Sequence, residues 1–180
     1  MINVALMIWP ARKEAISVPG SPVAVERFSV TAAKPFVEVL SAIAAQVGHP
    51  DMRQFVTDMQ AASDDQQLQA VVNNVGPSDL MEFMRLDQGA VIGSEVGSDV
   101  PNVMRLLIGN PLTMRRMAKH VPDAGSYAPV TILVDERADG VHLSYDRMAS
   151  LLAPYENPQA LEVAKSLDSK VESLLLSAAQ

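Results

Sequence analysis

Residues 128–145, APVTILVDERADGVHLSY, decide the fold of this 180-residue chain. They contain two β-rich runs, at 130–136 and 141–145, separated by Ala138-Asp139-Gly140. A turn that joins two antiparallel strands needs a residue with positive φ, and a glycine after an aspartate supplies it. The stretch therefore predicts a β-hairpin, and with it antiparallel strand pairing.

The run 141–145 alternates, so its side chains should lie on two faces. In a regular strand Val141, Leu143 and Tyr145 share one face, and His142 and Ser144 share the other. His142 and Tyr145 therefore point away from each other and should not act as a pair. The simplest interpretation of His142 is an exposed strand residue, and a lone general base near neutral pH is the alternative.

Further apolar runs predict strands on either side of this hairpin in the sequence. They lie at residues 23–31, 80–86, 90–96 and 103–108. Asp87-Gln88-Gly89 separates the runs 80–86 and 90–96 and suits the turn of a second hairpin.

Apolar residues at helical spacing predict helices between these strands. The expected helices lie at 35–47, 52–59, 63–75, 112–120 and from 158 onward. Pro35 and Pro158 suit a first helical turn, because the N–H that proline lacks would be unpaired there. The elements do not alternate strictly between strand and helix. We therefore expect an α+β fold, an antiparallel sheet backed by helices, rather than a parallel doubly wound sheet.

The length suits one domain. The apolar run at 2–9 is too short to span a bilayer and has no basic segment before it, so we interpret it as a strand or a packed arm. We interpret Pro19-Gly20-Ser21-Pro22 as a joint, because proline and glycine interrupt regular structure. The expected organisation is an arm with its joint at 1–22 and one domain at 23–180, in a cytoplasmic protein.

The chain is acidic, with a formal net charge of −7, and it has no cysteine. An acidic chain repels the phosphate backbone, and no run of Lys and Arg compensates, so we expect no nucleic-acid partner. The same lack of basic clusters argues against attachment to a membrane surface. Without cysteine, disulfides, thiolate metal sites and cysteine nucleophiles are excluded.

Several segments resemble the domain-of-unknown-function 302 family. They are LLIGNP (106–111), PVTILVDE (129–136) and VHLSYD (141–146), with a looser likeness at ERFSV (26–30). The resemblance implies a compact α+β fold, a TATA-box-binding-protein-like sheet backed by helices, and a tendency to form homodimers. It implies no activity. Against this family, the segment 49–77 resembles a helical insertion.

Gly109-Asn110-Pro111 is the sharpest candidate site. In the structural interpretation, Gly109 allows a tight turn through its freedom in φ, Asn110 caps the following helix, and Pro111 occupies its first position. In the functional interpretation, the amides of that helix start bind an anionic group together with Arg115 and Arg116. Both interpretations remain open at the level of sequence.

Other candidate chemistry is weaker. His49, His120 and His142 form no metal-binding motif, and we expect no metal site. Met114 and Met117 lie three residues apart and could converge on copper, but core packing explains methionine at least as well. No nucleophile, phosphate-loop or dinucleotide motif occurs, so the catalytic residues are unknown and no cofactor is expected.

Two functions therefore remain. The first is a homodimeric, non-enzymatic module that binds a small ligand or a partner. The second is an enzyme acting on a small anionic organic substrate, in a pocket near the helix start. The candidate ligand-binding residues are Gly109, Asn110, Arg115, Arg116 and Tyr145.

Overall fold

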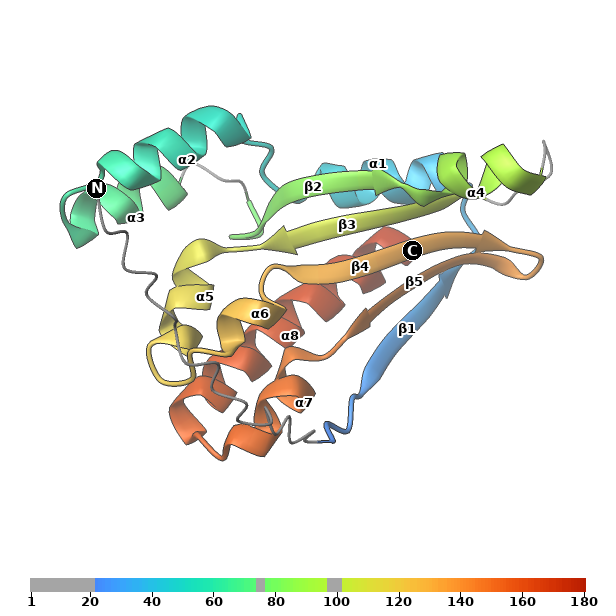
Figure 1. Cartoon of the computed structure of the whole chain (residues 1–180). Coiled ribbons are helices and arrows are strands. Elements are labelled where there is room, and N and C mark those ends of the chain that lie inside the picture. The colour runs from blue at the N-terminus through green and yellow to red at the C-terminus, as the bar shows by residue number, and fades with distance from the viewer. Residues whose placement is uncertain (1–21, 74–76, 97–101) are drawn as a thin grey trace, which may run out of the picture.

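The computed structural model describes residues 22–73, 77–96 and 102–180, and these show the expected α+β architecture (Figure 1). Within these ranges five strands form an antiparallel sheet in the order β1-β5-β4-β3-β2. The strands are β1 (Arg27–Ala32), β2 (Met81–Asp87), β3 (Val103–Gly109), β4 (Val130–Arg137) and β5 (Gly140–Asp146). The arm expected at 1–22 lies outside the described residues, apart from Pro22.

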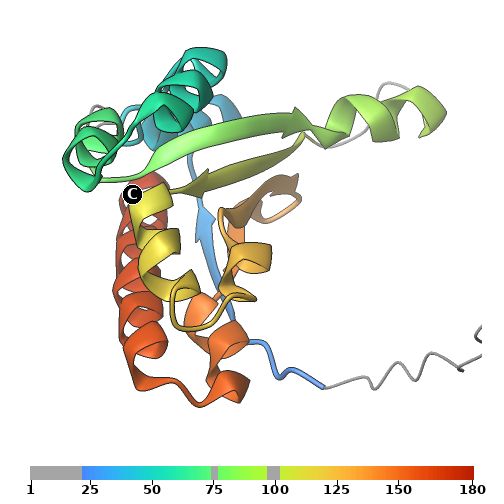
Figure 2. The same cartoon turned by 60° about the vertical axis from the view of Figure 1, so that its left-hand side comes forward.

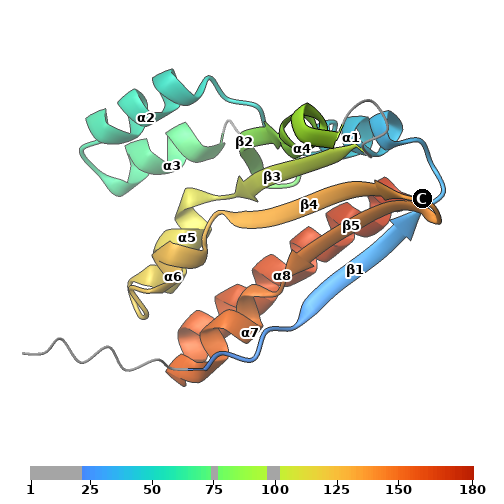
Figure 3. The ribbon, with the colours of Figure 1, turned by 45° about the vertical axis from the view of Figure 1, so that its right-hand side comes forward.

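Helices back one face of this sheet. The helices are α1 (Phe36–Ala44), α2 (Met52–Ala61), α3 (Asp65–Asn73), α4 (Gln88–Val96), α5 (Pro111–Ala118), α6 (Ala124–Tyr127), α7 (Met148–Leu152), the 3-10 turn η1 (Ala153–Tyr155) and α8 (Pro158–Ala179). Helices α1 and α8 contact each other and the strands, and Figure 3 shows α8 running behind β4 and β5. None of the described helices has the length and hydropathy needed to cross a membrane.

The hairpin of β4 and β5 confirms the prediction from residues 128–145. Its register pairs Arg137 with Gly140. The three residues predicted to share the inner face of β5 are each at most 2 % exposed, and His142 lies on the other face. The period-two pattern therefore sets which side of the sheet the helices cover.

The core lies between the sheet and α8. Leu106, Ile132 and Tyr145 occupy one cross-strand row on β3, β4 and β5 and are almost fully buried. Helix α8 presents a long apolar stripe to them, and Asn157 caps its start by accepting a hydrogen bond from the N–H of Ala160 (2.9 Å). The predicted start of the last helix is confirmed.

The strand predicted at 90–96 is wrong, because these residues belong to α4. The Oδ1 of Asp87 accepts a hydrogen bond from the N–H of Ala90 (2.9 Å), which is the geometry of a helix cap. Asp87-Gln88-Gly89 thus starts a helix instead of turning a hairpin, and β2 pairs with β3. Figure 2 shows α4 extending away from the sheet.

Helices α2 and α3 form a helical pair beside β2 (Figure 2). Phe55 and Val72 from this pair bury Met81 of β2 in a second, smaller apolar cluster. Asp51 caps α2 by accepting hydrogen bonds from two backbone N–H groups. The helices expected here are confirmed, and the status of 49–77 as an insertion stays a prediction.

Candidate functional site

The helix start at Asn110 is bonded within the protein. Asn110 is 6 % exposed. Its Oδ1 accepts hydrogen bonds from the N–H groups of Leu112 (2.8 Å) and Thr113 (3.3 Å). Its Nδ2 donates to the carbonyl oxygen (3.0 Å) and the Oδ1 (2.8 Å) of Asp79. Two of the amides that an anion would need therefore already have a partner.

Gly109 precedes this cap without a positive φ. A Cβ at this position would lie 3.2 Å from the Cβ of Pro129 and 3.3 Å from its Cα. The prediction that the turn needs the freedom of Gly109 in φ is therefore wrong. Glycine is suited to this position because the Pro129 segment passes close to the backbone.

The structure separates the other predicted site residues. Arg115 pairs with Asp65 of α3 (2.8 Å), and both side chains are exposed. Arg116 is exposed on α5. Tyr145 is 2 % exposed, and its hydroxyl donates to Oδ1 of Asp168 on α8 (2.9 Å). The Tyr145 hydroxyl is thus committed to the core and does not join the Asn110 cap.

Asn110 should contribute more to stability than an ordinary cap, because both ends of its amide are bonded. We expect Asn110→Ala to lower the free energy of unfolding by about 2 kcal/mol. Asn157→Ala, at a cap whose side chain accepts a hydrogen bond from Ala160, is the matched control and should cost about 1 kcal/mol. Urea denaturation measures both. Equal losses for the two variants would show that the bonds to Asp79 contribute nothing.

A hollow of about 620 Å³ lies on the face of the sheet that α1 and α8 leave open. Its floor comes from β1, β3, β4 and β5, and its wall comes from the region of α6 and from α7. The lining residues are Arg27, Gln88, Arg105, Leu107, Ser126, Tyr127, Ala128, Pro129, Val130, Thr131, Leu133, Ser144, Tyr145, Asp146 and Leu151. Of the predicted site residues, Tyr145 alone belongs to this lining.

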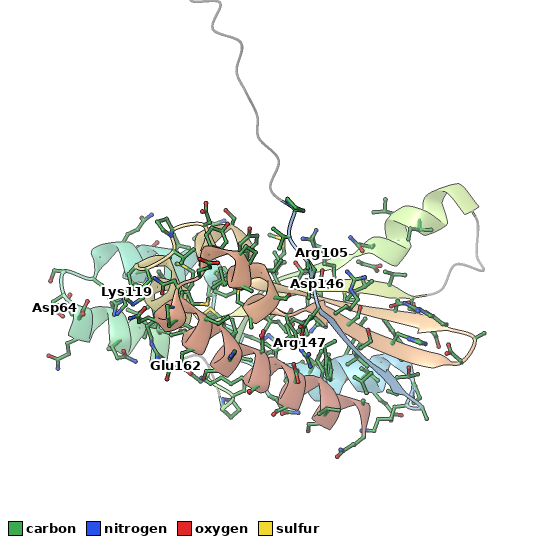
Figure 4. The ribbon with its side chains drawn as sticks, turned by 90° about the horizontal axis from the view of Figure 1, so that it is seen from below. Asp64, Arg105, Lys119, Asp146, Arg147 and Glu162 are labelled. Carbon is green, nitrogen blue, oxygen red and sulfur yellow. The ribbon has the colours of Figure 1, made fainter. Side chains whose placement is uncertain are left out.

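Arg105 contributes a positive charge to the lining of the hollow, and Figure 4 labels it together with Asp146. Its terminal nitrogen Nη2 donates to the Oγ1 of Thr131 at 3.3 Å. Its Nε is buried without a hydrogen-bond partner. No carboxylate among the described residues forms an ion pair with Arg105. A buried guanidinium donor without a partner is uncommon in folded proteins.

The positive charge of the second arginine of the hollow is balanced by a carboxylate. The Nε of Arg27 lies 2.7 Å from the Oδ1 of Asp146, and its Nη2 lies 3.0 Å from the Oδ2. This side-chain hydrogen bonding to Asp146 raises the pKa of Arg27 above its usual value. Arg27 therefore stays charged and bonded, and Arg105 supplies the uncompensated positive charge of the lining.

Two tyrosines meet beside the hollow. The hydroxyl oxygens of Tyr127 and Tyr155 lie 3.2 Å apart. This hydrogen bond raises the pKa of Tyr155 to about 12. The hydroxyl of Tyr155 thus stays protonated at neutral pH, and its hydrogen bond reaches Tyr127 in the lining of the hollow.

An acid–base pair lies elsewhere, at the β4–β5 turn. The Nε2 of His142 lies 2.8 Å from the Oδ1 of Asp139, and its Nδ1 lies 3.5 Å from the Oγ1 of Thr31. Hydrogen bonding to His142 lowers the pKa of Asp139. None of these three residues lines the hollow. In the described ranges, no group of three or more potential metal ligands is found.

Sequence reasoning missed Arg105. Its segment, VMRLLIG (103–109), is apolar except for this residue. The available signal was the alternation itself, because Leu106 and Ile108 face the core and so place Arg105 on the opposite side. Which side remains uncovered depends on the packing of α1 and α8.

The fold and the site define a class of protein: an α+β domain whose antiparallel sheet is backed by helices on one face and hollowed on the other. The chain belongs to the family described as "Domain of unknown function DUF302", whose model matches residues 55–178. That range begins inside the segment 49–77.

A solved structure has the same fold. The crystal structure of the uncharacterized conserved protein DUF302 from Bacillus stearothermophilus has a TM-score of 0.58 and 10 % sequence identity. The likeness covers 84 % of this chain and 97 % of the other. None of the curated proteins compared with the chain matches it.

Proposed function

We propose that this protein is a small-molecule-binding module whose ligand occupies the hollow on the open sheet face. The observation that supports this proposal is the volume of about 620 Å³, bounded by four strands and by the region of α6 and α7. Sites for small organic molecules typically measure roughly 300–1,000 Å³ and combine apolar walls with a few polar groups. The lining of this hollow has that mixed character.

Binding is favoured over catalysis by the titratable groups of the lining. Its carboxylate, Asp146, is hydrogen-bonded to Arg27. Its two phenols are also hydrogen-bonded, Tyr127 to Tyr155 and Tyr145 to Asp168. The acid–base pair of His142 and Asp139 lies outside the lining. General acid–base chemistry needs a proton carrier within hydrogen-bond reach of the substrate. Among the described residues, the hollow therefore offers groups for recognition, and its carboxylate and phenols already have hydrogen-bond partners.

A variant that fills the hollow tests the proposal. Ser144→Trp places a large side chain on the open face of β5, and Ser41→Trp, at an exposed position of α1, is the control. Native mass spectrometry and thermal shift with a fragment panel should detect ligands of the wild type and of Ser41→Trp that Ser144→Trp does not bind. Ligands that bind all three proteins alike would contradict the proposal.

The protein is, in the same proposal, a homodimer. Support comes from edge strand β2, where Met84 and Leu86 are 48 % and 39 % exposed, and from Ile92 of α4, which is 45 % exposed. Apolar side chains that cluster on a surface commonly mark a contact with another chain.

Light scattering should give a two-chain mass for the wild type and a one-chain mass for Leu86→Asp. Val37→Asp, at an exposed position of α1, is the control. A one-chain mass for the wild type would contradict dimerisation.

A further inference from the structure

The lining of the hollow specifies a ligand class. We infer that the ligand is an organic monoanion, with a carboxylate or a similar oxyanion at Arg105 and an apolar body along the sheet. This inference rests on the proposed function of the hollow.

Arg105 has few hydrogen-bond partners for a partly buried guanidinium. A guanidinium has five N–H donors, and the one hydrogen bond that Arg105 makes with the described residues is a contact of 3.3 Å to Thr131. That distance exceeds the usual 2.9–3.0 Å of such bonds. Its buried Nε is removed from water, which weakens the screening of the charge. An oxyanion on the terminal nitrogens would give Arg105 the anionic partner that the described residues do not provide.

The lining of the hollow carries a small positive charge. Arg27 and Arg105 are positive and Asp146 is negative, which leaves a net charge of +1. The whole chain has a formal net charge of −7. One negative charge on the ligand would therefore be balanced locally, whereas a second or third would meet the field of an acidic protein. This favours a monoanion over a polyphosphate.

An apolar surface lies beside Arg105 in the hollow. On the open face Arg105 lies opposite Leu133, and Leu107 lies opposite Thr131. The two leucines are thus diagonal neighbours, and both are half-buried. Leu151 from α7 and the ring of Tyr127 complete an apolar side. A flat or aliphatic body of a few carbon atoms matches this surface, with its acid group at Arg105.

Benzoate and benzamide form the decisive probe pair, because they share a ring and differ in charge. Isothermal titration should give benzoate about tenfold or more higher affinity than benzamide for the wild type. In Arg105→Gln, which keeps a polar side chain and removes the charge, the preference for benzoate should vanish while benzamide binding stays unchanged. Arg85→Gln, which removes an arginine bonded to Glu82 of the same strand and outside the hollow lining, is the control and should keep the preference. Inorganic phosphate should bind less tightly than benzoate.

The outcomes separate the two proposals. Equal affinity for benzoate and benzamide, or an unchanged preference in Arg105→Gln, would overturn the monoanion class and leave the hollow as the ligand site. Phosphate binding as tight as benzoate binding would overturn the apolar body. Absence of saturable benzoate binding at millimolar concentrations would also overturn the inference. If benzoate bound Ser144→Trp and the wild type alike, the assignment of the hollow itself would fail. Thermal melts of each variant establish that it is folded.

Discussion

Asp168→Ala should lower the free energy of unfolding by about 3–5 kcal/mol, one of the two largest effects expected from a single substitution. Asp168 lies on α8 and is 6 % exposed. Its Oδ1 accepts hydrogen bonds from the Tyr145 hydroxyl (2.9 Å) and the Met148 N–H (2.8 Å), and its Oδ2 accepts one from the Ala149 N–H (3.0 Å). Alanine would leave three donors without their partner and would remove the cap of α7.

Urea denaturation of the variant measures this loss. Tyr145→Phe is the matched control, because it removes one of the three donors and leaves the α7 cap in place. It should cost about 1 kcal/mol. A loss in Asp168→Ala no larger than that of Tyr145→Phe would contradict a capping role for Asp168.

The carboxyl of Asp168 should also make the stability of the fold depend on pH, in a direction that follows from its pKa. Burial raises the pKa of Asp168 above its usual 3.8, and hydrogen bonds from Ala149, Tyr145 and Met148 oppose part of this rise. A group whose pKa is higher in the folded state stabilises the fold most at low pH. Its contribution is fully present below the unfolded pKa near 3.8 and is lost as the pH rises through the folded pKa.

We therefore expect the stability of the wild type relative to Asp168→Asn to decrease as the pH rises from about 4 to 7. The comparison isolates Asp168, because the other carboxyl groups titrate in both proteins. Denaturation at a series of pH values measures it. A relative stability that increased with pH would show that the folded protein favours the ionised carboxylate.

Gly140→Ala should have the second large effect and lower the free energy of unfolding by about 3 kcal/mol or more. Gly140 has a φ of +135°, a conformation that residues with a side chain rarely adopt. A Cβ there would also lie 2.7 Å from the carbonyl oxygen of Ala32 on neighbouring β1. Strain and a clash with backbone therefore act together, and neither is relieved by rotating a side chain.

Gly125→Ala is the matched control, because a Cβ there would meet nothing within 4 Å. Gly125 lies in helix α6, where alanine is the better helix former, so its substitution should be neutral or slightly stabilising. Thermal unfolding compares the two. A melting temperature for Gly140→Ala equal to that of the wild type would show that the β1–β5 edge yields at little cost.

Local patterns in the sequence were sufficient for much of the fold. The hairpin at 128–145 depends on period-two alternation and on a turn of adjacent residues, and the caps at Asn110 and Asn157 act within three residues. Such interactions are set by neighbours in the chain, so sequence spacing predicts them. The burial of Tyr145 followed from the same alternation, although its bond to Asp168 joins residues far apart in the chain.

Tertiary structure decided the secondary structure of the run 90–96 and the surroundings of Arg105, because local sequence patterns fit more than one outcome for each. The run 90–96 is apolar enough for a strand or a helix, and the bond from Ala90 to Asp87 together with the pairing of β2 and β3 makes it a helix. The sequence alone determined that Arg105 lies opposite the core side of β3. Its lack of a carboxylate partner among the described residues depends on Arg27 meeting Asp146 across β1 and β5, and on α1 and α8 leaving that face open. Those pairings join residues more than a hundred positions apart, and no spacing in the chain encodes them.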